Sequence, residues 1–304
     1  MSIATEISRL QTAKANIKTA IESKGVVVPD TATLDSYNTY VSQIQTGGGT
    51  GGDTNYLAQY VTNSLPENIT SAQLGTNIGS NMVDYLFCGQ YYITSVDLTG
   101  TGATKIANNF CKDTISITSI IIPDTVTKIG DGFCENTNIS TFTIPSSITS
   151  IGSYFLSATQ ISSIIIPSNV TSLSYSCFDL CASLTQVTFN ANIANIPEGF
   201  CINNTSLALV DLNSSVTSID RKCFSLSSSS TELLEVILRN TNSVVTLPNE
   251  IGSTSYYSAF KYRRNIKLYV PSALKASYEA DSNWAAGVTT GYLTIETIEG
   301  SQYE

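Results

Sequence analysis

Residues 117–138 read ITSIIIPDTVTKIGDGFCENTN, residues 139–160 read ISTFTIPSSITSIGSYFLSATQ, and residues 161–183 read ISSIIIPSNVTSLSYSCFDLCAS. Each stretch has a short β-branched run, often closed by proline, then a second extended piece and a compact helical turn. The pattern starts at Ile93, Ile117, Ile139, Ile161, Leu184, Leu207 and Leu233, in steps of 24, 22, 22, 23, 23 and 26 residues. One unit has too little apolar surface to fold alone, so we expect stacked units that share a continuous core.

Alternation along each predicted strand separates inward from outward side chains. The inward positions are Ile117, Ile120, Ile122, Ile139, Phe142, Ile144, Ile161, Ile164, Ile166, Leu184, Val187 and Phe189. One outward row is Asp97, Ile121, Thr143, Ile165, Thr188, Asp211 and Ile237, and the other is Ser95, Ser119, Thr141, Ser163, Gln186, Leu209 and Glu235. Three isoleucines in the first row indicate a protein contact or a covered surface, although β-branched residues also favour strands in general. We expect the first row to form the interaction face.

The order L-x-x-I-x-I-P, V-T-x-I-G, a pair of core residues and a polar turn resembles the BspA-like leucine-rich repeat. The unit that begins at Ile161 matches best, with Cys177, Phe178 and Cys181 at the core positions. IKLYVPSALKASYEADSNW at residues 266–284 resembles the terminal cap of such arrays. The resemblance covers residues 57–284 and implies a right-handed solenoid with a parallel sheet on its inner face. It also implies a surface adhesion or recognition module.

The first 46 residues have a different pattern. Ile3, Ile7, Leu10, Ile17 and Ile21, with Lys14 among them, follow the four-three spacing of a coiled-coil seam. An ordinary amphipathic helix is the alternative, because the stretch spans only about three heptads. The prediction is a helix that oligomerises the chain or anchors it to a partner.

GGGTGGD at residues 47–53 contains the pattern G-x-G-x-x-G. A dinucleotide site needs that loop between a strand and a helix. Here the loop follows a predicted helix and no βαβ unit surrounds it, so a flexible linker is expected. The predicted organisation is a helical module at 1–46, a Gly-rich linker at 47–55, a solenoid with an N-terminal cap at 56–265, and a C-terminal cap at 266–304. The expected fold is therefore a β-rich leucine-rich-repeat solenoid, a parallel sheet with short helical turns, preceded by a small helical module.

Residues 7–44, ISRLQTAKANIKTAIESKGVVVPDTATLDSYNTYVSQI, resemble an amino-terminal module of tail, baseplate and fibre proteins in phages of gut bacteria. The shared features are the Ala- and Lys-rich helix, the KGV-x-VP break and the LDSY helix. The resemblance implies a virion component that is assembled in the host cytoplasm. The start, MSIATEISRL, has no basic region followed by an apolar core, so we do not expect a secretion signal there.

Charge and composition exclude several function classes. The formal net charge is -9, which disfavours a nucleic-acid partner, and no apolar run is long enough for membrane insertion. Histidine is absent, which removes the usual general base and the commonest metal ligand. We therefore expect no catalytic residues, no cofactor and no metal, and the protein is not expected to be an enzyme.

The cysteines alternate with phenylalanine at two adjacent positions of the repeat. The pairs are Phe87-Cys88, Phe110-Cys111, Phe133-Cys134, Phe155-Leu156, Cys177-Phe178, Phe200-Cys201 and Cys223-Phe224. Exchange at constant summed volume is typical of core packing, whereas a catalytic thiol would not change places with its neighbour. A zinc site at Cys177-x-x-x-Cys181 is the sharper alternative, and a disulfide framework is a third.

Two further groups of residues, one basic and one acidic, are candidate sites. KYRRNIK at residues 261–267 is the only basic cluster, and a solvated turn is favoured there over a phosphate or lipid head-group site. Asp97, Asp211 and Glu235 are the acids expected on the exposed sheet face, but their predicted spacing does not suit a glycosidase pair.

The combined prediction is a non-enzymatic bacteriophage virion structural protein, a fibre-like or decoration component. Its expected partners are other virion proteins and itself, as a homo-oligomer with a trimer as one form, together with a host-surface protein or glycan. The alternative is a BspA-like adhesin on a bacterial cell surface.

Overall fold

A computed structural model describes residues 14–22, 71–73, 82, 84–249, 251 and 258–304. The chain divides into two compact units, residues 1–52 and 53–304. In the first unit the described residues 14–22 form a helix in which Ile21 is 3% exposed and Ile17 is 37% exposed. Ile3, Ile7 and Leu10 lie outside the described residues, as do the predicted boundary at residue 46 and the whole of the predicted linker. The seam and these boundaries therefore stay predictions.

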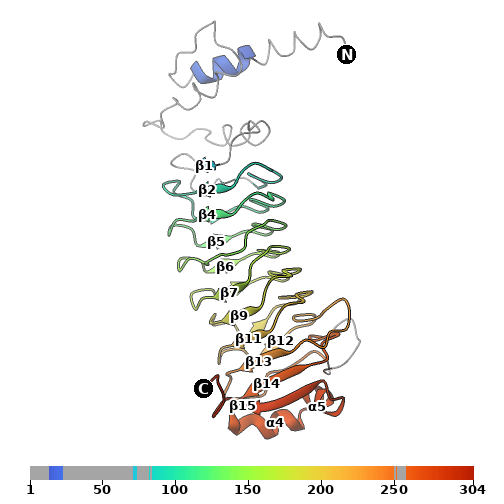
Figure 1. Ribbon diagram of the computed structural model, residues 1–304. Helices are drawn as coiled ribbons and strands as arrows, with labels where there is room; N and C mark the ends of the chain where they lie inside the picture. The colour runs from blue at the N-terminus through green and yellow to red at the C-terminus, as the bar shows by residue number, and fades with distance from the viewer. Residues whose placement is uncertain (1–13, 23–70, 74–81, 83, 250, 252–257) are drawn as a thin grey trace. The chain divides into compact units, whose positions relative to one another are not determined.

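The second unit is a parallel β-solenoid whose successive strands stack along the chain (Figure 1). The longer strands are β1 (Ser71–Gln73), β2 (Ser95–Asp97), β4 (Ser119–Ile121), β7 (Ser163–Ile166), β9 (Gln186–Phe189), β11 (Leu209–Leu212), β13 (Leu234–Leu238), β14 (Ile266–Val270) and β15 (Leu293–Thr297). They form a three-stranded sheet, β1-β2-β4, and a six-stranded sheet, β15-β14-β13-β11-β9-β7. This confirms the predicted leucine-rich-repeat solenoid.

A second, shorter strand follows in most coils. These strands are β3 (Lys105–Ile106), β5 (Lys128–Ile129), β6 (Ser150–Ile151), β8 (Ser172–Leu173), β10 (Asn195–Ile196) and β12 (Ser218–Ile219). They pair in parallel as β3-β5-β6-β8 and β10-β12. Most coils therefore contribute to two ladders, which explains the second extended piece of the repeat.

The coil between β4 and β7 has no assigned strand on the side of the longer ladder, although the sequence predicts one there. Phe142 stands where the other coils place a smaller aliphatic side chain. Its ring packs edge-on between Phe133 and Phe155, at centroid distances of 5.7 and 5.5 Å. We attribute the break in the ladder to this larger ring, because it needs more room than an isoleucine between sheet and core.

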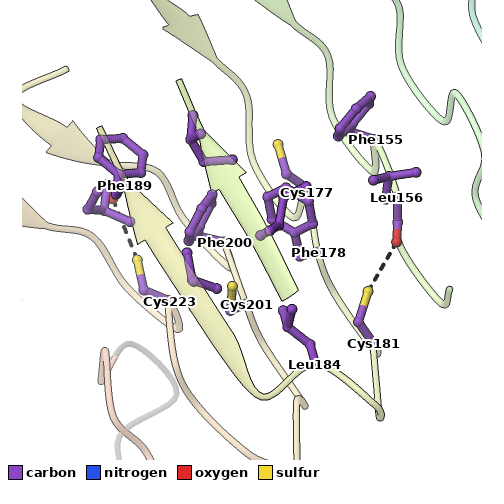
Figure 2. Close-up of a cluster of buried hydrophobic side chains, with 14 of the residues drawn as sticks. Phe155, Leu156, Cys177, Phe178, Cys181, Leu184, Phe189, Phe200, Cys201 and Cys223 are labelled. Carbon is purple, nitrogen blue, oxygen red and sulfur yellow. Dashed lines mark hydrogen bonds between the residues drawn. The ribbon is translucent and has the colours of Figure 1, made fainter. Parts of the chain in front are cut away.

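The compact turns carry the phenylalanine and cysteine layer of the core. Consecutive rings from Phe87 to Phe200 lie 5.2 to 6.1 Å apart. The order of the pair reverses at Cys177-Phe178, yet the ring of Phe178 still meets those of Phe155 and Phe200 (Figure 2). Main-chain hydrogen bonds join the same positions from coil to coil, as from Cys111 to Phe133 and from Cys201 to Cys223.

Hydroxyl and amide side chains close the coils, which explains the abundance of Ser, Thr and Asn. Thr149 and Thr171 each donate a hydroxyl hydrogen bond to the main-chain carbonyl of the threonine one coil earlier. At the end of the turn Thr159 donates to the carbonyl of Leu156, and the buried Asn204 donates to that of Phe178. The carbonyls of Thr127 and Thr149 also accept main-chain N–H groups of the next coil, so the side chains add to the main-chain bonds between coils.

The C-terminal cap consists of η2 (Ser272–Leu274), α4 (Lys275–Ala280), α5 (Ser282–Thr289) and β15. Asp281 caps α5 by accepting the main-chain N–H groups of Asn283 and Trp284. Trp284 and Tyr278 are fully buried, and both bond to the main chain of Val245, one as donor and one as acceptor. The rings of Phe260 and Trp284, 6.0 Å apart, extend the aromatic layer into the cap.

Candidate functional site

The outward side of the longer strands, here called the sheet face, is the candidate interaction surface. Its first row runs in register from Asp97 to Ile121 in one sheet. In the other sheet the row continues through Ile165, Thr188, Asp211, Ile237, Tyr269 and Glu296. Thr143 is exposed in the coil between the two sheets. The predicted alignment is thus confirmed, and the use of this row for binding stays a prediction.

The part of the sheet face from β2 to β9 is open to solvent. Ile121 is 52% exposed and Ile165 is 58% exposed. Ser119, Thr141 and Ser163 of the second row are exposed beside them. Asp97 accepts the main-chain N–H of Thr99, and hydrogen bonding to Thr99 lowers the pKa of its carboxyl. This open part presents isolated aliphatic side chains among hydroxyl groups.

Ile237 was predicted to be exposed in the same row, and that prediction is wrong. Its side chain is only 1% exposed. Residues on either side of Ile237 bond to Tyr303, which follows the last strand. Glu235 on β13 accepts the hydroxyl of Tyr303, and Arg239, directly after β13, donates to its carbonyl. The C-terminal residues therefore cover the part of the sheet face around β13.

The covered part is a network of charged and aromatic side chains. The guanidinium of Arg239 donates to both carboxylate oxygens of Asp211, at 2.8 and 3.0 Å, and this hydrogen bonding raises the pKa of Arg239. Glu235 accepts the hydroxyl of Tyr269 at 2.9 Å and that of Tyr303 at 2.7 Å. Burial, with a smaller contribution from Glu235, raises the pKa of Tyr303 to about 12.

A shallow polar pocket of about 540 Å³ adjoins this network. Its lining includes Glu235, Lys267 and Tyr269 from the sheet, and residues 299–302 from the segment after β15. The ammonium of Lys267 lies 5.2 Å from the centre of the Tyr269 ring. The sequence predicted none of these contacts, because no local pattern places the end of the chain on β13.

The acids weighed for catalysis are engaged in structural contacts. Asp211 and Glu235 lie on the neighbouring strands β11 and β13, two residues out of register, which is the offset of one pleat that the sequence predicts. Asp211 is paired with Arg239, and Glu235 accepts two tyrosine hydroxyls. Their oxygens are thus engaged by neighbouring side chains of the sheet face and by Tyr303.

The cysteines occupy the core. Six of the seven are buried, Cys88 is partly exposed, and all seven are free thiols. Cys177 donates to the carbonyl of Ser174 at 3.0 Å. Cys181 donates to the carbonyl of Leu156 at 3.0 Å (Figure 2). Burial raises the pKa of both thiols. The packing interpretation is confirmed for the six buried cysteines. The predicted pair Phe87-Cys88 is wrong by one residue, because Leu86 and Phe87 fill the two core positions there and Cys88 lies just beyond them. Across the described residues no three His, Cys, Asp or Glu side chains come together as metal ligands.

The basic cluster contains a buried arginine, which corrects the prediction of a solvated turn at this position. Arg263 is 0% exposed. Its guanidinium donates to the main-chain carbonyls of Phe224, Leu207 and Asn204. Burial lowers the pKa of Arg263 to about 10, so the side chain remains charged at neutral pH. It supports the fold and does not face solvent as a phosphate-binding group would.

None of the helices in the described part of the chain is long and apolar enough to cross a membrane. No protein of curated function matches the sequence. Among solved structures, the chain is similar to a leucine-rich repeat protein of T. pallidum, with 16% identity over 49% of this chain and 73% of that one, and a TM-score of 0.42. It is also similar to a leucine-rich repeat protein from Bacteroides ovatus, with 15% identity over 66% of this chain and a TM-score of 0.44. A third is a leucine rich cell surface protein from Faecalibacterium prausnitzii, with 17% identity over 72% of this chain and a TM-score of 0.29.

This chain covers 63% of the length of each of the last two proteins. A family model described as BspA type Leucine rich repeat region matches residues 104–231 in six copies. The matched residues include the quoted repeats and the coils from β3 to beyond β12. The central part of the solenoid is therefore similar to a BspA-type leucine-rich repeat region.

Proposed function

We propose that this protein is a non-enzymatic recognition module that binds a partner through the open part of its sheet face. The observation that carries the proposal is the exposure of Ile121 and Ile165, 52% and 58%, on a regular surface otherwise lined by hydroxyl groups. Apolar side chains surrounded by uncharged polar groups are typical of the centre of a protein interface. The partner is expected to be a protein or a glycan on a host surface.

The double variant Ile121→Thr, Ile165→Thr tests this proposal. Threonine already occupies the same row on β9 at Thr188, so the strands should form as before. We expect binding of the labelled protein to intact gut bacterial cells to weaken at least tenfold. Ile115→Thr, at a 44% exposed isoleucine away from the sheet face, is the matched control. Undiminished binding by a folded double variant would contradict the proposal.

We further propose that the module is part of a bacteriophage virion, as a fibre-like or decoration component. What supports this is the order of a helical segment, a Gly-rich segment and a solenoid, together with the resemblance of residues 7–44 to phage tail, baseplate and fibre modules. Residues 1–46 would attach the protein to the particle and join copies into an oligomer, for example a trimer. Other virion proteins would be its partners.

Deletion of residues 1–46 tests the anchoring role. The remaining chain should keep its folded circular dichroism spectrum, run as a monomer in light scattering, and be missing from purified particles. Particles that still contain the truncated protein would contradict an anchor in residues 1–46.

A bacterial surface adhesin is the second candidate, and the BspA-type repeat region favours it. The two candidate functions predict different neighbouring genes. Genes for capsid and tail proteins beside this one support the virion role, whereas genes for secretion and wall anchoring support the adhesin.

A further inference from the structure

The residues after β15, Ile298–Glu304, fold back onto the sheet face and are called the tail here. The tail begins where the main-chain N–H of Ile298 donates to the carbonyl of Val270 on β14. Glu299 accepts the main-chain N–H of Ser272, at the start of η2. Ser301 bonds to Ile298, and Gly300 bonds to Glu304, within the tail itself. Tyr303 reaches the sheet face.

Tyr303 contacts three side chains of the sheet face at once. Its hydroxyl donates to Glu235 at 2.7 Å, and its carbonyl accepts from Arg239 at 3.1 Å. Its ring packs edge-on against Tyr269, with centroids 4.8 Å apart. Glu235 and Ile237 lie on one face of β13, and Arg239 follows directly after the strand, so a residue bonded to Glu235 and Arg239 lies over Ile237. This accounts for the burial of Ile237, whereas Ile121 and Ile165 in the same row are open.

The three contacts show which groups of Tyr303 the sheet face binds. Glu235 is fixed by the hydroxyl of Tyr269 and presents its second oxygen to an incoming phenol. Arg239 is fixed by both oxygens of Asp211, and its remaining nitrogen takes a main-chain carbonyl. Ile237 and the Tyr269 ring form the apolar part of this surface, and the Tyr269 ring packs against the ring of Tyr303. A phenol, an aromatic ring and a main-chain carbonyl in this arrangement are offered together by a tyrosine within a polypeptide.

We propose that Glu235, Ile237, Arg239 and Tyr269 form a subsite for a tyrosine-bearing polypeptide segment, and that the tail occupies this subsite in the free protein. A partner segment and the tail therefore compete for the same place. The subsite is continuous with the open part of the sheet face, because the row passes in register from Thr188 through Asp211 to Ile237. The proposal does not require Ile121 or Ile165, so it can hold or fail independently of the proposed function.

The full-length variant Tyr303→Ala tests the proposal, with the acetylated heptapeptide of residues 298–304, IEGSQYE, as the labelled probe. The variant leaves the subsite empty, so we expect the peptide to bind it at least tenfold more tightly than it binds the unmodified protein, measured by fluorescence anisotropy. The same peptide with alanine in place of its tyrosine should not bind. Equal binding of the peptide by both proteins, or equal binding of both peptides, would overturn the proposal.

Two further variants separate the subsite from its surroundings. In the Tyr303→Ala background, Glu235→Gln should weaken peptide binding at least fivefold, because a neutral amide accepts the phenol less strongly. Ile121→Thr in that background should leave peptide binding unchanged, which distinguishes this subsite from the open part of the sheet face. If Tyr303→Ala lowers the melting temperature markedly, Tyr303→Phe keeps the ring, loses the hydroxyl bond and should bind the peptide with intermediate affinity. A folded Tyr303→Phe protein that binds no better than the unmodified one would likewise overturn the proposal.

Discussion

Phenylalanine and cysteine fill one layer of the core in successive coils, and their exchange at Cys177-Phe178 and Cys223-Phe224 keeps the volume nearly constant. A buried thiol behaves as a small apolar side chain, and burial raises its pKa and makes it unreactive. Cys88 is the partly exposed member of the set. The repeat motif therefore marks a packing position.

Thiol titration should distinguish Cys88 from the other cysteines. With a disulfide reagent at pH 8, we expect one thiol to react quickly in the native protein and six to react only after denaturation. Cys88→Ser should remove the fast phase and leave the slow one unchanged. Rapid reaction of several thiols in the native state would show that the core is more accessible than the structure indicates.

Among the basic residues, Arg263 is the one whose substitution should lower the free energy of unfolding most. Arg263→Met removes the donors to the carbonyls of Phe224, Leu207 and Asn204 and leaves buried acceptors unsatisfied. We expect a loss of about 3 kcal/mol in the free energy of unfolding, measured by urea denaturation. Lys261→Met, at a partly exposed lysine over the Tyr262 ring, should change it by less than about 1 kcal/mol. Similar losses for both variants would contradict the structural role of Arg263.

Asp179 should make the stability depend on pH. Burial raises the pKa of its carboxyl to about 6, and its Oδ1 has no hydrogen-bond partner among the described residues. Because the folded state holds this proton more tightly than the unfolded chain, with a pKa of about 3.9, stability falls as the pH rises from about 4 to 6.

Asp179→Asn should therefore raise the melting temperature at pH 7 and raise it less at pH 4. Asp124→Asn, on an exposed turn, serves as the control and should leave the difference between the two pH values as in the unmodified protein. A gain from Asp179→Asn that is equal at both pH values would refute the raised pKa as its cause.

At the scale of the element, the close approach of neighbouring coils determines where glycine is required. A Cβ added to Gly152 would lie 2.5 Å from the main-chain carbon of Gly130 and 2.6 Å from the nitrogen of Asp131. One coil further on, Ser174 occupies the equivalent position, so the spacing there admits a side chain. The glycine is thus needed for main-chain contact.

Gly152→Ala should force the two coils apart and lower the free energy of unfolding by about 1 to 3 kcal/mol. Ser174→Ala is the matched control, and we expect it to change the stability by less than about 0.5 kcal/mol. Chemical denaturation measures both values. Equal stability of the Gly152→Ala variant and the unmodified protein would mean that the coils can separate at little cost.

The regular ladder could be predicted because strand alternation is local, and the register of Ile165, Thr188 and Asp211 agrees with the sequence pattern. The break at the coil of Phe142 could not. Whether a ring replaces an aliphatic side chain without disturbing the ladder depends on the space left by Phe133 and Phe155 in the neighbouring coils. That space is a property of the packed core.

At the scale of the whole molecule, each coil of the solenoid contacts mainly its neighbours, so stability passes along the chain from interface to interface. The C-terminal cap closes one end of the core with Tyr278 and Trp284, both fully buried. Damage to the cap should therefore destabilise the strands beside it before the more distant ones.

Trp284→Ala should lower the free energy of unfolding by about 3 to 5 kcal/mol, because it leaves a cavity and removes the indole bond to Val245. In hydrogen exchange, the amides of β13 and β14 should lose protection more than those of β2 and β4. Asn283→Ala, which removes one side-chain bond to Leu247, is a milder control in the same helix. A uniform loss of protection along the array would show that the solenoid unfolds as a single unit instead.

The sequence by itself determined the coil: its length, the inward and outward rows, the phenylalanine and cysteine layer, and the cap around Trp284. These features follow from residues within one repeat and from its immediate neighbours, and the repetition makes them readable. The tertiary structure alone decided that Arg263 is buried, that Ile237 is covered, and that Tyr303 bonds to Glu235 and Arg239. Tyr303 bonds to partners 64 and 68 residues earlier in the chain, and these contacts do not follow the repeat of the sequence. Local periodicity thus sets the pattern of side chains on the sheet face. The long-range contacts of Tyr303 set the boundary between its open and covered parts.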